Sequence, residues 1–127
     1  MKEAFTILIA DRNPNVRELL KRELVAEGDH VHLARSGREV LNWVDAATRS
    51  PDLVIMDPDL PDMGEVSLLE LIRQKRPELP VVVHTFLAEY INHPIVLSSA
   101  AVVEKDGRHV DRLKEVVKEV LTKVHAR

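Results

Sequence analysis

The stretch "ILIADRNPNVRELL", residues 7 to 20, contains a strand pattern, a polar turn and the start of a helix pattern. Four apolar residues, Ile7 to Ala10, run directly into Asp11, as expected for a buried strand that ends at a polar edge. Asn13 followed by Pro14 is typical of a helix N-cap with a proline in the first turn. This stretch therefore predicts the first half of a strand–helix–strand unit.

The same alternation continues along the chain. Short, mostly apolar runs predict strands that are buried on both faces, as in a parallel sheet. These runs are Phe5 to Ala10, His30 to Ala34, Leu53 to Met56, Val81 to His84 and Ala101 to Glu104.

Helix patterns with start and stop signals fill the intervals between the predicted strands. The first is closed by Gly28, the second starts with a predicted capping box of Ser36 and Glu39, and the third stops before Pro77. The last runs from about Val110 to Val124 with one apolar stripe.

The fourth interval, residues 86–100, contains Pro94 and several β-branched residues, so its crossover helix is expected to be short, broken or mobile. Strands that alternate with helices through right-handed crossovers predict an α/β fold. The expected architecture is a three-layer sandwich with a five-stranded parallel sheet and helices on both faces.

Composition limits the class of protein. A length of 127 residues predicts a single domain over residues 1–127, and only 3% aromatic residues implies a core of Val, Leu, Ile and Ala. The absence of cysteine excludes disulfides and thiol chemistry. No apolar run is long enough for a signal peptide or a membrane span. We therefore expect a soluble, cytoplasmic protein. A net charge of −3, with acids and bases interleaved, argues against a nucleic-acid partner.

Polar side chains follow the predicted strands where each strand ends. In an open parallel sheet, ligands bind beyond the carboxyl ends of the strands. Two acids, a hydroxyl and an ammonium at this edge are the groups needed to carry a phosphoryl group on a carboxylate. The candidate residues are Asp11, Arg12, Asp57, Asp59, Thr85 and Lys105.

At these positions the sequence resembles the receiver domain of bacterial two-component response regulators, a family with a flavodoxin-like fold. The resemblance rests on Asp11, on "DLVIMDPDLPDM" (residues 52 to 63) with Asp57 and Pro61, on "PVVVHT" ending in Thr85, and on "AAVVEKD" with Lys105. It covers essentially the whole chain, with the five predicted strands in order.

The resemblance implies a role for each matched residue. Asp57 would accept a phosphoryl group from a phosphohistidine of a sensor histidine kinase or phosphotransfer protein. Asp11 and Asp57, with the backbone carbonyl of Asp59, would hold Mg²⁺. Lys105 and Thr85 would contact the phosphoryl oxygens. The chain would not be an enzyme beyond transfer to, and hydrolysis of, its own aspartyl phosphate.

Arg12 departs from the family pattern, because the family usually has a second Mg²⁺-binding acid there. A guanidinium only donates hydrogen bonds and cannot ligate a cation. Three interpretations stay open: Arg12 points to solvent, it lies across Asp11 and Asp57 as a cation that replaces the metal, or it leaves room for a weak Mg²⁺ site. The second has a physical motive, since close carboxylates repel unless positive charge intervenes.

Other positions have simpler interpretations. Phe86 stands where the family tends to have a small residue, and Val102 stands where an aromatic residue is common. His30 and His32, two residues apart on a strand, are expected to be exposed edge residues because no third metal ligand is apparent. His84 is expected to pack against a helix.

Three functions compete. The first is a phosphoacceptor that switches the binding of an unidentified downstream protein. The second is a degenerate receiver that acts as an interaction module without phosphorylation. The third is a phosphatase with "DPD" (residues 57 to 59) as its nucleophile motif, but the motif follows the third strand rather than an early one.

Overall fold

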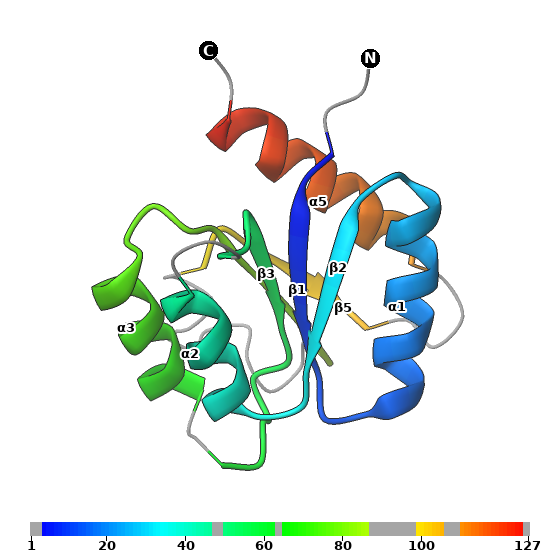
Figure 1. Ribbon diagram of the computed structural model, residues 1–127. Coiled ribbons are helices and arrows are strands. Elements are labelled where there is room, and N and C mark those ends of the chain that lie inside the picture. The colour runs from blue at the N-terminus through cyan, green and yellow to red at the C-terminus, as the bar shows by residue number, and fades with distance from the viewer. Residues whose placement is uncertain (1–3, 47–49, 63–64, 87–98, 106–109, 126–127) are drawn as a thin grey trace.

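The computed structural model describes residues 4–46, 50–62, 65–86, 99–105 and 110–125, with no side-chain detail for residues 65–67 (Figure 1). The described residues form five strands and four helices. The strands are β1 (Thr6–Ala10), β2 (His30–Ala34), β3 (Leu53–Met56), β4 (Val81–Thr85) and β5 (Ala101–Glu104). The helices are α1 (Pro14–Ala26), α2 (Gly37–Asp45), α3 (Glu65–Lys75) and α5 (Asp111–Val124).

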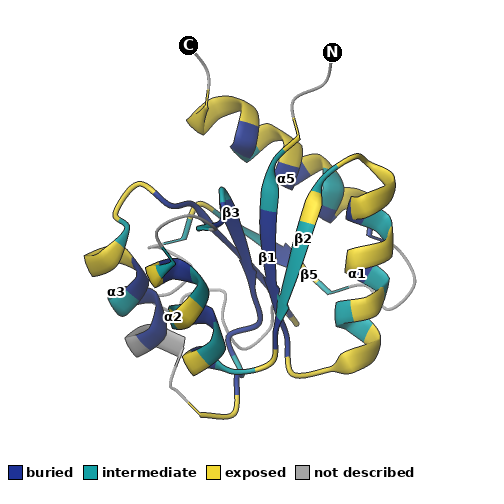
Figure 2. Ribbon diagram, in the orientation of Figure 1, coloured by how far each residue is buried: buried dark blue, intermediate teal, exposed yellow. Residues whose placement is uncertain are grey.

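The strands form one parallel sheet in the order β2-β1-β3-β4-β5. Helices α1 and α5 cover one face, and α2 and α3 cover the other (Figure 1). The predicted three-layer α/β sandwich is therefore confirmed. The central strands β1 and β3 are almost entirely buried (Figure 2).

Alternate residues of the central strands belong to different hydrophobic cores. In β1, Ile7 and Ile9 pack with α1 and α5, whereas Leu8 and Ala10 pack with α2 and α3. This follows from the two-residue period of a strand. It explains why these strands are continuously apolar in the sequence rather than alternating.

The start signals of two helices are present, with one difference. The Asn13 side chain accepts a hydrogen bond from the Asn15 backbone N–H, and the Ser36 hydroxyl accepts one from the Glu39 N–H. The predicted capping box is incomplete, because the Glu39 carboxylate accepts from the backbone N–H of Arg35 at 3.1 Å instead of from that of Ser36.

Helix α1 ends in a Schellman motif, which confirms the stop predicted at Gly28. The Gly28 N–H donates to the Val25 carbonyl at 2.9 Å, and the Asp29 N–H donates to the Leu24 carbonyl at 3.2 Å. Gly28 has a φ of +96°, in the left-handed region. The chain can thus reverse directly into β2.

Several predicted bounds shift slightly. β1 begins at Thr6 rather than Phe5, and β4 continues one residue further, to Thr85. Most of the fourth crossover, residues 87–98, lies outside the described residues, so its expected break stays a prediction. Among the helices described here, none has the length and apolar character needed to span a bilayer.

Substitution of Gly28 tests the backbone contribution alone, since a Cβ at this position would meet no atom within 4 Å. We expect Gly28→Ala to lower the free energy of unfolding by about 1 kcal/mol, because a left-handed conformation costs an L-residue that much. Gly28→Asn should lose less, since Asn tolerates positive φ. Urea unfolding of the three proteins measures both effects. Equal losses in the two variants would contradict this explanation.

Candidate functional site

The site lies at the carboxyl edge of the sheet, where backbone hydrogen bonds continue one residue past the strands. The Asp11 N–H donates to the Ala34 carbonyl at 3.1 Å, and the Asp57 N–H donates to the Ala10 carbonyl at 2.8 Å. The Lys105 N–H donates to the Thr85 carbonyl at 2.7 Å. These bonds fix the predicted residues at the ends of four neighbouring strands.

Two carboxylates, those of Asp11 and Asp57, are each only 1% exposed. Asp57 Oδ1 accepts a hydrogen bond from the Asp59 N–H at 3.0 Å, and Oδ2 accepts from the Arg12 N–H at 3.3 Å. Asp11 Oδ1 accepts from the Asn13 N–H at 2.8 Å. Backbone donors therefore satisfy three of the four carboxylate oxygens.

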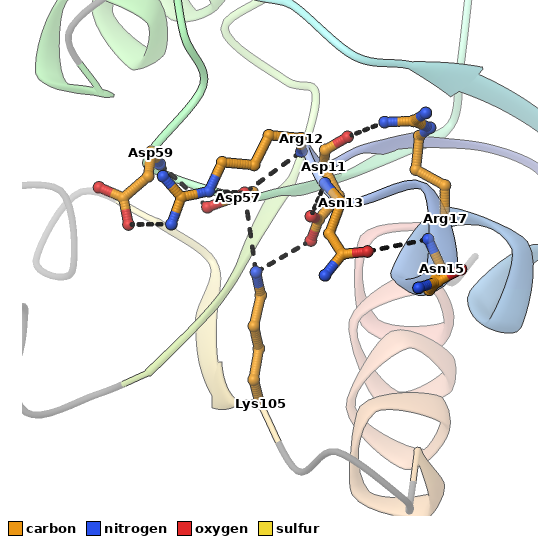
Figure 3. A network of polar contacts seen from close by, with 8 residues as sticks. All are labelled: Asp11, Arg12, Asn13, Asn15, Arg17, Asp57, Asp59 and Lys105. Atoms are coloured by element: carbon orange, nitrogen blue, oxygen red, sulfur yellow. Dashed lines mark hydrogen bonds and ion pairs between the residues drawn. The ribbon is translucent and has the colours of Figure 1, made fainter.

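Lys105 supplies the positive charge between these acids (Figure 3). Its Nζ lies 3.1 Å from Asp11 Oδ2 and 3.6 Å from Asp57 Oδ2. Asp11 Oδ2 is buried and, within the described part of the chain, accepts no hydrogen bond, so this ion pair is its polar contact there. Burial raises the pKa of Asp11 and the charge of Asp57 adds to the rise, against the lowering effects of the Asn13 N–H and Lys105.

Arg12 extends over Asp57 toward Asp59 (Figure 3). Its Nε lies 3.7 Å from Asp57 Oδ2, its Nη2 lies 3.8 Å from Asp59 Oδ2, and its side chain is 57% exposed. This arrangement resembles the bridging interpretation, but the partners are Asp57 and Asp59 rather than Asp11 and Asp57. Lys105 takes the place beside Asp11.

Arg17 belongs to the site although the sequence did not single it out. Its Nη1 donates to the backbone carbonyl of Asp11 at 2.6 Å, which ties the first turns of α1 to the end of β1 (Figure 3). Arg17 lies six residues after Asp11, and no motif in the sequence signals the contact.

The remaining candidates take defined places. Thr85 is buried at the end of β4, and Val102 packs against the core under α2 and α3. Phe86 is 65% exposed, and Lys105 Nζ lies 5.6 Å from its ring centroid in a cation–π contact. Phe86 thus lies beside Lys105 at the protein surface.

Three histidines were singled out in the sequence. His30 is exposed on the edge strand, as predicted, whereas His32 is half-buried and stacks on Trp43 with ring centroids 3.9 Å apart. His84 is buried and lines a pocket with residues of α1, which agrees with packing against a helix. Its Nδ1 has no hydrogen-bond partner among the described residues.

The chain matches the family model of the response regulator receiver domain over residues 7–118. It belongs to this family. The predicted resemblance and its receiver fold are therefore confirmed, and the chain is a signalling receiver domain of the response-regulator type.

Curated relatives of this receiver are longer regulators. It is 35% identical over 83 residues to the regulatory protein AtoC of Escherichia coli, which covers 65% of this chain and 18% of AtoC. It is 35% identical over 77 residues to the DNA-binding transcriptional regulator NtrC of Klebsiella pneumoniae, which covers 61% of this chain and 16% of NtrC. The chain spans less than a fifth of the length of either relative.

Solved receivers are also similar. The response regulator TrrA of Thermotoga maritima, in complex with Mg²⁺-BeF, superposes with a TM-score of 0.81 at 32% identity, covering 91% of this chain and 98% of TrrA. A chain of the complex of the histidine kinase ThkA with TrrA superposes on this chain with a TM-score of 0.82 at 32% identity. The match covers 92% of this chain and 98% of the matched chain.

The buried His84 predicts a pH-dependent stability. Burial, with a further contribution from the charge of Lys105 and against that of Asp57, lowers the pKa of His84 from 6.5 to about 4. Between these values the unfolded chain binds a proton that the folded protein does not. The contribution of His84 to the free energy of unfolding should therefore fall by about 3 kcal/mol as the pH drops from 6.5 to 4.

Urea unfolding between pH 7 and pH 4 measures this loss. His84→Leu is the matched control, because it keeps a buried side chain but cannot titrate. The variant should lose less stability over this range than the wild-type protein. Parallel pH profiles would show that His84 is not the cause.

Proposed function

We propose that this receiver accepts a phosphoryl group on Asp57 from a phosphohistidine of a sensor histidine kinase or phosphotransfer protein, and so switches its binding to a downstream protein. The observation that carries the proposal is the position of Asp57: a buried carboxylate at the end of a central strand, with a lysine and an arginine at its Oδ2. The solved complex of ThkA with TrrA supports a histidine kinase as the partner class.

The reaction is a transfer between two nucleophiles. A carboxylate oxygen of Asp57 attacks phosphorus, an O–P bond forms, and the P–N bond of the phosphohistidine breaks with its electron pair returning to the imidazole nitrogen. Negative charge then increases at the end of β3. Lys105, with its ammonium 3.6 Å from Asp57 Oδ2, would stabilise that charge.

The neighbouring residues have supporting roles in this proposal. Asp11 holds Lys105 in place through the 3.1 Å ion pair, and Thr85, buried one strand away, would offer its hydroxyl to a phosphoryl oxygen. Both roles are possible because Asp11 and Thr85 lie at the ends of β1 and β4, the two strands beside β3, which Asp57 directly follows. The reaction is confined to the aspartyl phosphate of the chain itself, so the protein would act as a switch and not as a general phosphatase.

Magnesium is the cation implied by the family, and TrrA was solved with Mg²⁺-BeF. Its ligands here would be Asp11, Asp57 and the Asp59 carbonyl, and Mg²⁺ would offset charge on the phosphoryl oxygens. These residues fit the ion poorly, because Arg12 contributes donors where an acid ligand is needed. Over the described residues, no group of three or more His, Asp or Glu side chains is arranged to hold a metal.

In the same proposal, residues 1–127 work as one receiver domain in the cytoplasm, and their partners are proteins. The relative NtrC is a DNA-binding regulator, so the absence of a nucleic-acid partner stays a prediction for this chain.

The contacts of Arg12 favour a second candidate. The guanidinium beside Asp57 and Asp59 stays charged at every relevant pH, as would suit a degenerate receiver that binds its partner without phosphorylation. The two candidates differ in whether Asp57 reacts at all.

Intact mass after incubation with acetyl phosphate and Mg²⁺ distinguishes them. We expect a gain of one phosphoryl group in the wild-type protein and in Asp45→Asn, and none in Asp57→Asn. Asp45 is a matched control because it is an exposed acid at the end of α2 that pairs with Lys75 and not with the residues of the site. A folded wild-type protein that gains no mass would favour the degenerate receiver.

A further inference from the structure

We infer that Arg12 supplies, from within the chain, the positive charge that the family resemblance assigns to Mg²⁺, so that Asp57 can be phosphorylated without a divalent cation. The inference rests on the proposed phosphorylation of Asp57. It assigns Arg12 as a residue that would contact the transferred phosphoryl group.

Two cations, Lys105 and Arg12, contact the three acids Asp11, Asp57 and Asp59. Lys105 lies closest to Asp11, at 3.1 Å, and also reaches Asp57. Arg12 reaches Asp57 and Asp59 at 3.7 and 3.8 Å. The guanidinium thus stands against Asp57, which the resemblance assigns to the metal, and against the side chain of Asp59, of which the resemblance assigns only the backbone carbonyl. It lies on a different side of Asp57 from the ammonium (Figure 3).

The charge of the cluster argues against an additional divalent ion. Three carboxylates face one ammonium and one guanidinium, which leaves a single excess negative charge. An acid in place of Arg12 would make this cluster of charged side chains much more negative and would add an oxygen ligand for a cation. Mg²⁺ would therefore have to displace the guanidinium or accept its repulsion.

The backbone of Arg12 is held by a hydrogen bond, whereas its guanidinium contacts the acids at longer distances. The Arg12 N–H donates to Asp57 Oδ2 at 3.3 Å, which fixes where the side chain begins. The guanidinium contacts, at 3.7 and 3.8 Å, are longer than direct hydrogen bonds, and the side chain is 57% exposed. An exposed guanidinium at these distances can exchange its carboxylate partners for phosphoryl oxygens.

A guanidinium suits this role chemically. Its planar set of donors matches two oxygens of a phosphoryl group, and it stays charged at every relevant pH. It would stabilise the negative charge that collects on the phosphoryl oxygens during transfer.

The rate of phosphorylation by acetyl phosphate, followed by intact mass in EDTA and in Mg²⁺, tests the inference. The wild-type protein should react at rates within about twofold in the two buffers. Arg12→Asp, which restores an acid ligand, should react about tenfold or more slowly in EDTA and recover in Mg²⁺. Arg12→Met should be slow in both buffers.

Arg22→Asp is the matched control for the change of charge, because Arg22 is an exposed arginine of α1 paired with Glu23, away from the acids. It should behave like the wild-type protein. Wild-type phosphorylation that requires Mg²⁺ would overturn the inference while leaving the proposed function intact.

Thermal unfolding over a Mg²⁺ titration gives a second readout that does not depend on phosphorylation. A ligand that binds the folded state raises Tm, so Tm should rise with Mg²⁺ in Arg12→Asp and stay constant in the wild-type protein. A rising wild-type Tm would overturn the inference. No mass gain in either buffer would overturn the proposed function, and the titration would still decide whether Arg12 replaces the metal charge.

Discussion

Two carboxylates buried side by side are the constraint on which this receiver depends. Asp11 and Asp57 are almost inaccessible to water, and charges of the same sign in such surroundings repel each other strongly. The ammonium of Lys105 makes the arrangement possible by contacting both. All three residues must therefore come from strands that lie close in the sheet, which the order β1-β3-β4-β5 provides.

The two hydrophobic cores hold these strand ends in register. Because alternate residues of β1 and β3 pack on opposite faces, a slip of one residue would exchange the contents of the two cores. The acids are consequently fixed by apolar packing on both sides of the sheet. The Arg17 side chain, on α1, also donates a hydrogen bond to the carbonyl of Asp11. This bond connects the helix after the loop to the residue at which the loop begins.

The sequence predicted the fold, and the meeting of Asp11, Asp57 and Lys105 at one edge, for the same reason, but it gave no signal for Arg17. Buried parallel strands have a recognisable apolar pattern, and their carboxyl ends must meet at one edge. The partners of loop side chains were harder to predict. Arg12 pairs with Asp59 rather than Asp11, and the Glu39 carboxylate accepts from Arg35, because these directions depend on loop torsions that periodicity does not determine.

The backbone N–H of Arg12 donates to the carboxylate of Asp57 instead of to a neighbouring strand. Arg12 is thus the first residue after β1 whose backbone N–H donates to a side chain of the site and not to a neighbouring strand. Its side chain contributes nothing to either hydrophobic core. At this position the charge of the site can change without a change in the fold. A single codon can therefore reverse the charge beside Asp57 while every strand keeps its register.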